Sequence, residues 1–226
     1  MSERAARAAR RRLALALRAL RDELVVTAAG AEELLAAAQQ VCAMTESFAR
    51  QRSAEPIGEL QSPVGVGVPG MGDFRERGPI VGLASVVAPP AELAADMEAR
   101  LVQGSVEFSV AFEGAPGLVH GGFLAAVLDE ALGMATMFAG ALCMTGEITL
   151  RFLRPTPTRT PLRIVARCDR HEGRRVYTSG AILDGDEATV EARGTFVAVG
   201  TERFGELDAE RARKADSGGA RDTDAS

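Results

Sequence analysis

The sequence contains few of the residues that build disulfide scaffolds and metal centres. Its 226 residues include three cysteines, two histidines, one tyrosine and no tryptophan. Cys42, Cys143 and Cys168 are odd in number and show neither a CxxC motif nor a Cys/His spacing suited to zinc. We therefore expect no disulfide framework, no metal, no other cofactor, and a reducing, cytoplasmic location.

The chain also has neither a large excess of one charge sign nor a long hydrophobic run. The formal charge is -5, from 26 basic and 31 acidic residues, which argues against a nucleic-acid-coating protein. No stretch reaches the roughly 18 to 20 unbroken apolar residues of a membrane span. The basic start is similar to a signal peptide, but Arg18, Arg21 and Asp22 interrupt its apolar part. Its Arg-rich, acid-poor composition also resembles a mitochondrial presequence, which stays an alternative. We predict no nucleic-acid partner and no membrane span.

Residues 1–52 are predicted to form a helical extension. Leucines recur at helical spacing from Leu13 to Leu24, and the pattern resumes after a break near Gly30. An arginine cluster at 7–12 is interpreted as a solvated helix face. Residues 53–79, rich in proline and glycine, are predicted to be a linker, and the charged tail at 205–226 is predicted to be disordered.

Between residues 80 and 204 the pattern changes to strands around one apolar helix. The helix is predicted at 121–138, where apolar residues cover so much of the circumference that it must be largely buried. Strands are predicted at 80–87, 104–112, 147–152, 162–168, 176–183 and 188–199, with hairpin turns at 171–174 and 184–186. The expected fold class is α+β, an antiparallel sheet wrapped round one long buried helix. A free sheet edge would favour a dimer.

A Gly/Pro-rich loop runs directly into the buried helix and ends in His120-Gly121-Gly122. The glycines let a ligand approach the first free N–H groups of the helix, where the helix dipole favours an anion or a developing oxyanion. A purely structural alternative is a loop that only turns, with His120 capping the helix.

Asp129 lies in the middle of the apolar helix. An ionised carboxylate there costs several kcal/mol unless it is paired or faces a cavity, which makes Asp129 a candidate for chemistry. The neighbouring Glu130 is assigned to the solvent or loop side, although periodicity does not exclude the reverse. Thr145, on the strand after the helix, offers a hydroxyl near the helix end, or serves only as a strand former.

The segment 119–130, which reads VHGGFLAAVLDE, resembles the signature of PaaI-type hotdog-fold acyl-CoA thioesterases, and most of all the branch with thioesterase superfamily members 4 and 5. Further similarity lies at 113–117, 144–146, 154–157 and 172–174, so that it covers roughly residues 80–200. The resemblance implies a hotdog fold and hydrolysis of acyl-CoA, a substrate that brings its own coenzyme A.

The resemblance also implies the roles of three residues in or near this motif. Asp129 is the general base or nucleophile, and the N–H of Gly121, after His120, polarises the thioester carbonyl. Thr145 helps to hold the attacking water. Other branches carry an asparagine in the loop before the motif, where this chain has Gly114.

Spacing along the helix indicates that two chains share one site. With a rise of 1.5 Å per residue, Gly121 and Asp129 stand roughly 12 Å apart, too far to act on one thioester. A twofold dimer, or a tetramer of two such dimers, would bring the two residues together. Arginines at the ends of strands can be reached by a long ligand and can bind the coenzyme A phosphates. The candidate substrate-binding residues are Gly122, Arg154, Gly173, Arg174 and Arg175.

Two other functions compete with this prediction. One is a non-catalytic hotdog regulator that senses acyl-CoA and binds nucleic acid through its N-terminal helices, although a sensor would not need Asp129. The other is a hotdog hydratase, whose Asp and His lie five residues apart, whereas here the separation is nine.

Overall fold

The computed structural model describes residues 3–52, 76, 78–89 and 91–199. Two helices, α1 (Glu3–Val26) and α2 (Ala31–Ala49), form the helical extension. Gly30 is the N-cap of α2, which confirms the predicted break. The predictions for most of the linker at 53–79 and for the tail at 205–226 lie outside the described residues.

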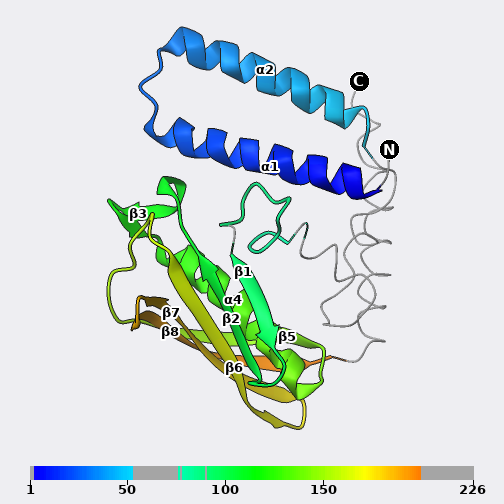
Figure 1. The fold of residues 1–226 in the computed structure, drawn as a ribbon, viewed down its shortest axis with the longest axis vertical. Helices are drawn as coiled ribbons and strands as arrows, with labels where there is room; N and C mark the ends of the chain where they lie inside the picture. The colour runs from blue at the N-terminus through cyan, green and yellow to red at the C-terminus, as the bar shows by residue number, and fades with distance from the viewer. Residues whose placement is uncertain (1–2, 53–75, 77, 90, 200–226) are drawn as a thin grey trace, which may run out of the picture.

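The rest of the described chain is built on a six-stranded antiparallel sheet in the order β1-β2-β6-β7-β8-β5 (Figure 1). Its strands are β1 (Glu92–Asp96), β2 (Leu101–Val106), β5 (Cys143–Phe152), β6 (Leu162–Glu172), β7 (Arg175–Asp184) and β8 (Glu187–Ala198). A small second sheet pairs β3 (Glu113–Ala115) with β4 (Leu118–Val119). The predicted hairpin turns carry Gly173 at φ 58° and Gly185 at φ 61°, a conformation that favours glycine.

One helix, α4 (Gly121–Ala135), lies against the concave side of this sheet and continues into a 3-10 turn, η2 (Thr136–Ala139). The residues that α4 buries are Leu124, Val127, Leu128, Ala131, Leu132 and Ala135. By length and composition alone, Gly121–Ala139 could cross a bilayer, but here it supplies the centre of the hydrophobic core. The α+β prediction of a sheet around one buried helix is confirmed.

Two strand predictions are wrong at the start of the domain. Residues 80–87 form turns and bends, because the carbonyls of Gly82, Leu83 and Ser85 accept hydrogen bonds from the guanidinium of Arg18 instead of from a neighbouring strand. The strand expected at 104–112 begins earlier and ends at Val106, and a 3-10 turn, η1 (Val110–Phe112), follows it. The alternation beyond Val106 reflects burial of Phe108 and Phe112, not strand pairing. Sequence analysis missed β1.

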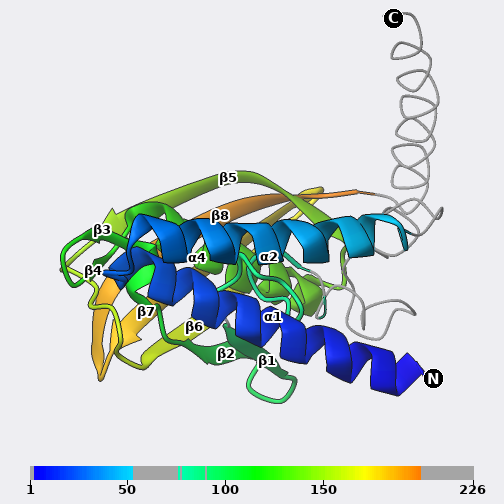
Figure 2. The ribbon, with the colours of Figure 1, turned by 90° about the horizontal axis from the view of Figure 1, so that it is seen from above.

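Helix α1 packs on the sheet domain, and α2 lies on the side of α1 away from it (Figures 1 and 2). Ala14 and Arg18 are buried, whereas α2 has no buried residue. Arg11 is paired with the carboxylate of Glu76, whose pKa is lowered chiefly by that hydrogen bond. The Arg11 side chain is nevertheless 46% exposed, as expected for a solvated helix face.

Candidate active site

The structure joins two of the predicted site residues. The Thr145 hydroxyl, near the start of β5, donates a hydrogen bond of 2.8 Å to the Oδ1 atom of Asp129 in α4. The chain reverses direction between the two elements at Gly140, which ends η2 with φ 68°. This reversal brings a hydroxyl and a carboxylate 16 residues apart into contact, with the second oxygen of Asp129 left for another partner.

The two acidic neighbours are both half-buried. Asp129 accepts a hydrogen bond from Thr145 that is exposed to solvent. Glu130 is desolvated by its surroundings. Burial, and secondarily the charge of Asp129, raises the pKa of Glu130 to about 7. The expectation that Glu130 faces solvent is wrong, because α4 turns its aliphatic residues to the sheet and leaves Asp129 facing the start of the edge strand.

The raised pKa of Glu130 predicts a pH-dependent stability that glutamine would remove. Between about pH 4.5 and pH 7 the folded chain holds a proton that the unfolded chain has released, so wild-type stability falls as pH rises through this window. Glu130→Gln should lack this fall, and above pH 7 it should be more stable than wild type by about 3 kcal/mol at most. Urea unfolding from pH 4 to pH 9 at one protein concentration measures the difference.

The control for this prediction is Glu98→Gln, at an exposed turn residue after β1. Its unfolding free energy should follow that of wild type at every pH. A Glu130→Gln profile parallel to wild type between pH 4.5 and pH 7 would contradict the burial of this carboxyl.

His120 caps the N-terminus of α4, as the purely structural alternative predicted. The same helix end also leaves one backbone N–H donor free. His120 is the N-cap, and its Nδ1 atom accepts a hydrogen bond of 3.0 Å from the N–H of Gly122. The N–H of Phe123 donates to the His120 carbonyl. Among the described residues, the N–H of Gly121 has no acceptor, which leaves it for a ligand.

Close neighbouring atoms explain why glycine suits both positions of the motif. A Cβ at Gly122 would lie 3.1 Å from the Nδ1 atom of its own cap, His120, and one at Gly121 would lie 3.1 Å from the ring of Phe152. Phe152, near the end of β5, is 59% exposed. Sequence analysis did not single out this ring, because no local pattern links it to a helix 31 residues earlier.

The two halves of the candidate site lie apart within one chain. Eight residues of α4 separate Gly121 from Asp129, which corresponds to about 12 Å along the helix axis. The edge strand β5 borders both halves, with Thr145 at one and Phe152 at the other. A single chain thus presents an acid and hydroxyl at one place and a free N–H at another.

The three candidate arginines do not gather at one place either. Strand register puts Cys143 opposite Ala198 and Arg175 opposite Val197, so Arg174 and Arg175 lie near the Thr145 end of β5. Gly173 forms the turn before them. Arg154 follows the Phe152 end, where it is paired with Glu187 and donates to the carbonyl of Ala188. Arg174 donates to the Ala198 carbonyl at 3.3 Å.

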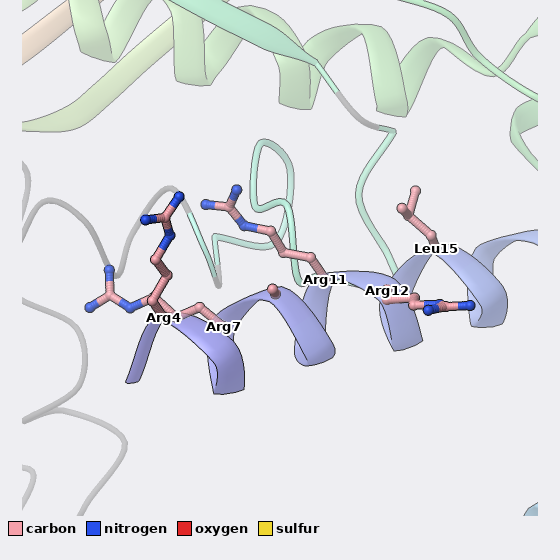
Figure 3. A pocket seen from close by; sticks show the side chains of 6 residues that line it. Arg4, Arg7, Arg11, Arg12 and Leu15 are labelled. Atoms are coloured by element: carbon pink, nitrogen blue, oxygen red, sulfur yellow. The ribbon is translucent and has the colours of Figure 1, made fainter. Parts of the chain in front are cut away.

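A pocket of about 640 Å³ lies along the N-terminal half of α1, away from the motif helix. It is lined by Arg4, Arg7, Ala8, Arg11, Arg12 and Leu15 (Figure 3). Arg11 extends from α1 toward the segment that carries Glu76, its partner. The pocket is about 15 Å along α1 from Arg21, the residue of this helix that reaches the loop before α4. We therefore place the candidate active site at α4 and β5.

Comparison with known proteins assigns this domain. Residues 116–191 match the Thioesterase superfamily. This range holds both halves of the candidate site, and the chain therefore carries a thioesterase superfamily domain with the hotdog fold.

Several relatives share this domain. The chain is 37% identical over 93 residues to acyl-coenzyme A thioesterase THEM4 of Bos taurus, which is 40% of this chain and 38% of the relative. It is 32% identical over 85 residues to acyl-coenzyme A thioesterase THEM5 of Homo sapiens, which is 38% of this chain and 34% of the relative. The chain thus spans well under half the length of these two curated relatives.

A solved structure shares more of the chain. Protein RHA08564, described as a thioesterase superfamily protein, has a TM-score of 0.71 and 28% identity, and the match covers 83% of this chain and 90% of the other. Because residues 53–226 make up about 77% of the sequence, a match over 83% of the chain includes part of the helical extension. The extension is therefore not peculiar to this chain.

Proposed function

We propose that this protein hydrolyses acyl-CoA thioesters to the free acid and coenzyme A. The observation that carries the proposal is the hydrogen bond from Thr145 to Asp129 in the same domain as the unoccupied N–H of Gly121. A base, a hydroxyl and a helix-terminal donor are the groups that acyl transfer to water requires. Similarity to the acyl-coenzyme A thioesterases THEM4 and THEM5 supports this substrate class.

The geometry supports the following steps. Thr145 holds one carboxylate oxygen of Asp129, and the other takes a proton from water as the water oxygen attacks the thioester carbon. The N–H of Gly121 stabilises the negative oxygen of the tetrahedral intermediate. The C–S bond then breaks, the thiolate of coenzyme A leaves, and it is protonated. Direct attack by Asp129, through a mixed anhydride that water then hydrolyses, uses the same groups.

The reaction requires two chains in this proposal. Strand β5 is a ten-residue sheet edge with exposed apolar side chains at Met144 and Phe152, and the exposed Leu153 follows it directly. Long apolar edges are normally covered. Antiparallel pairing of two β5 strands about a twofold axis would place Thr145 and Asp129 near the partner's Gly121, and would bring Arg174 toward the partner's Arg154.

The direct test is turnover across acyl-CoAs from two to eighteen carbons, measured as release of free thiol. We expect saturable hydrolysis with a preference for one range of chain length. Binding of acyl-CoA without thiol release would instead support the sensor function. The nucleic-acid alternative has fewer cations to draw on, since Arg11, Arg18 and Arg21 are engaged within the chain.

Arg174 provides a prediction about the nucleotide end of the substrate. Its position beside the turn at Gly173 and near the Thr145 end of β5 suits contact with a coenzyme A phosphate. Arg174→Ala should raise KM for acyl-CoA about tenfold, with kcat little changed, and should have little effect on a short thioester that lacks the nucleotide. Steady-state kinetics on both substrates measure this difference.

Arg50→Ala, at an exposed residue that caps the end of α2, is the matched control and should leave both KM values unchanged. Equal effects of Arg174→Ala on the two substrates would show that Arg174 supports the fold or the dimer, and that coenzyme A is held elsewhere.

A further inference from the structure

The last turns of α1 contact the loop that leads to the motif of His120. The Ser109 hydroxyl donates to the Oδ1 atom of Asp22 at 2.8 Å, and Arg21 donates to the Ser109 hydroxyl at 3.3 Å and to the same Asp22 oxygen at 2.9 Å. Arg21 also donates to the carbonyl of Val86 at 2.9 Å. These contacts join the helical extension to the domain through two charged groups and one hydroxyl, with each group bonded to the other two.

The hydrogen bond from Ser109 to Asp22 takes the place of a helix-capping hydrogen bond within η1. Ser109 is the N-cap of η1, where a serine hydroxyl commonly bonds a backbone N–H of its own helix. Here the side chain makes no cap hydrogen bond and reaches α1 instead. The orientation of η1 therefore depends on a residue pair almost 90 positions earlier in the sequence.

From η1 the contacts continue to the helix N-terminus. The guanidinium of Arg21 lies 4.5 Å from the centre of the Phe112 ring, and the edge of that ring packs on Phe123 at 4.8 Å. The carbonyl of Phe112 accepts the N–H of His120 at 2.8 Å. Phe112 thus holds the motif at two points, through the His120 backbone and through the first turn of α4.

We infer that Arg21 and Asp22 of α1 are positioning residues for the Gly121 N–H, so that the helical extension is a working part of the active site. This inference rests on the proposed function, since it assigns the α1 residues to the oxyanion donor of that reaction. They act by fixing η1, and through Phe112 the direction of the first N–H groups of α4. Small displacements of a catalytic group are costly in rate.

A neighbouring arginine allows docking and positioning to be separated. Arg18 also binds α1 to the domain, through the carbonyls of Gly82, Leu83 and Ser85. Within the part of the chain that the structure describes, none of its hydrogen bonds goes to η1 or to the motif. Loss of Arg18 should therefore weaken the docking of α1 without moving the Gly121 N–H directly. Arg12, exposed on the same helix, serves as a neutral control.

The experiment compares Arg21→Ala, Arg18→Ala and Arg12→Ala in the full chain with a saturating acyl-CoA. Arg21→Ala should lower kcat about tenfold with KM within twofold, because the lost contribution is to the transition state. Hydrogen–deuterium exchange should rise in the peptides that cover residues 109–123. Arg18→Ala should lower the unfolding temperature but retain kcat, and Arg12→Ala should match wild type in all three measurements.

A second variant tests the route through Ser109. Ser109→Ala should lower kcat by a smaller factor, and the double variant with Arg21→Ala should lose less than the product of the two single effects, since both changes disrupt the same group of Arg21, Asp22 and Ser109. Independent, multiplying effects would overturn the inference. So would a normal kcat for Arg21→Ala, or an equal loss of kcat in Arg18→Ala.

The inference and the proposed function fail differently. If Asp129→Asn abolishes turnover and Arg21→Ala leaves kcat and exchange unchanged, only the positioning role of α1 is wrong. If Asp129→Asn turns over normally, the proposed active site is wrong, and the positioning role falls with it.

Discussion

Asp129→Asn is expected to lower kcat by at least about a hundredfold, the size typical of losing a general base. The asparagine amide oxygen can still accept the Thr145 hydrogen bond, so local structure should persist. It cannot take a proton from water, and it is a poor nucleophile. Thiol release at saturating acyl-CoA measures the loss, with the unfolding temperature as a check on the fold.

Two further variants make this result specific. Asp186→Asn, at a fully exposed carboxylate in the β7–β8 turn, should turn over like wild type. Glu130→Gln addresses the neighbouring acid, whose pKa is raised to about 7 by burial. A near-normal Asp129→Asn together with an inactive Glu130→Gln would move the catalytic role to Glu130.

Mixing two inactive variants is expected to restore activity if the site is shared between chains. The first variant is Asp129→Asn. The second is Gly121→Pro, which deletes the N–H at the first position of α4, where proline suits the helix backbone. Its Cβ would lie 3.1 Å from the ring of Phe152, which is exposed and can shift to make room. His120 before it has φ -63° and ψ 130°, which also suits a following proline. Each variant alone should be inactive.

A heterodimer of these chains contains one intact site and one doubly altered site. With free exchange at equal amounts, half of the dimers are mixed, so about a quarter of wild-type activity should return. Asp129→Asn mixed with Thr145→Val is the matched control. Its two changes lie in the same half of the site, so no such recovery is expected. Absence of recovery despite demonstrated subunit exchange would place the whole site within one chain.

Much of the fold could be predicted because the signals are local. The apolar stretch at 121–138 predicted α4, since a helix that is apolar on most sides has to be buried. Alternation and Gly-containing turns predicted β6, β7 and β8. The helical break at Gly30 is likewise a property of neighbouring residues. For the site, the sequence singled out His120, Gly121, Asp129 and Thr145 through their surroundings and their resemblance to a family.

Only the tertiary structure decided what depends on distant partners. Residues 80–87 carry a β-branched run typical of a strand, but Arg18 takes their carbonyl groups and holds them as a loop. Periodicity could not tell that Glu130 is desolvated. Adjacent side chains point only about 100° apart round the helix axis, and packing on the sheet sets how the helix is turned about that axis. The ring of Phe152 beside Gly121 and the contact of Arg21 and Asp22 with Ser109 join residues far apart in sequence. Composition and spacing determine which elements form, whereas packing determines which side chains meet.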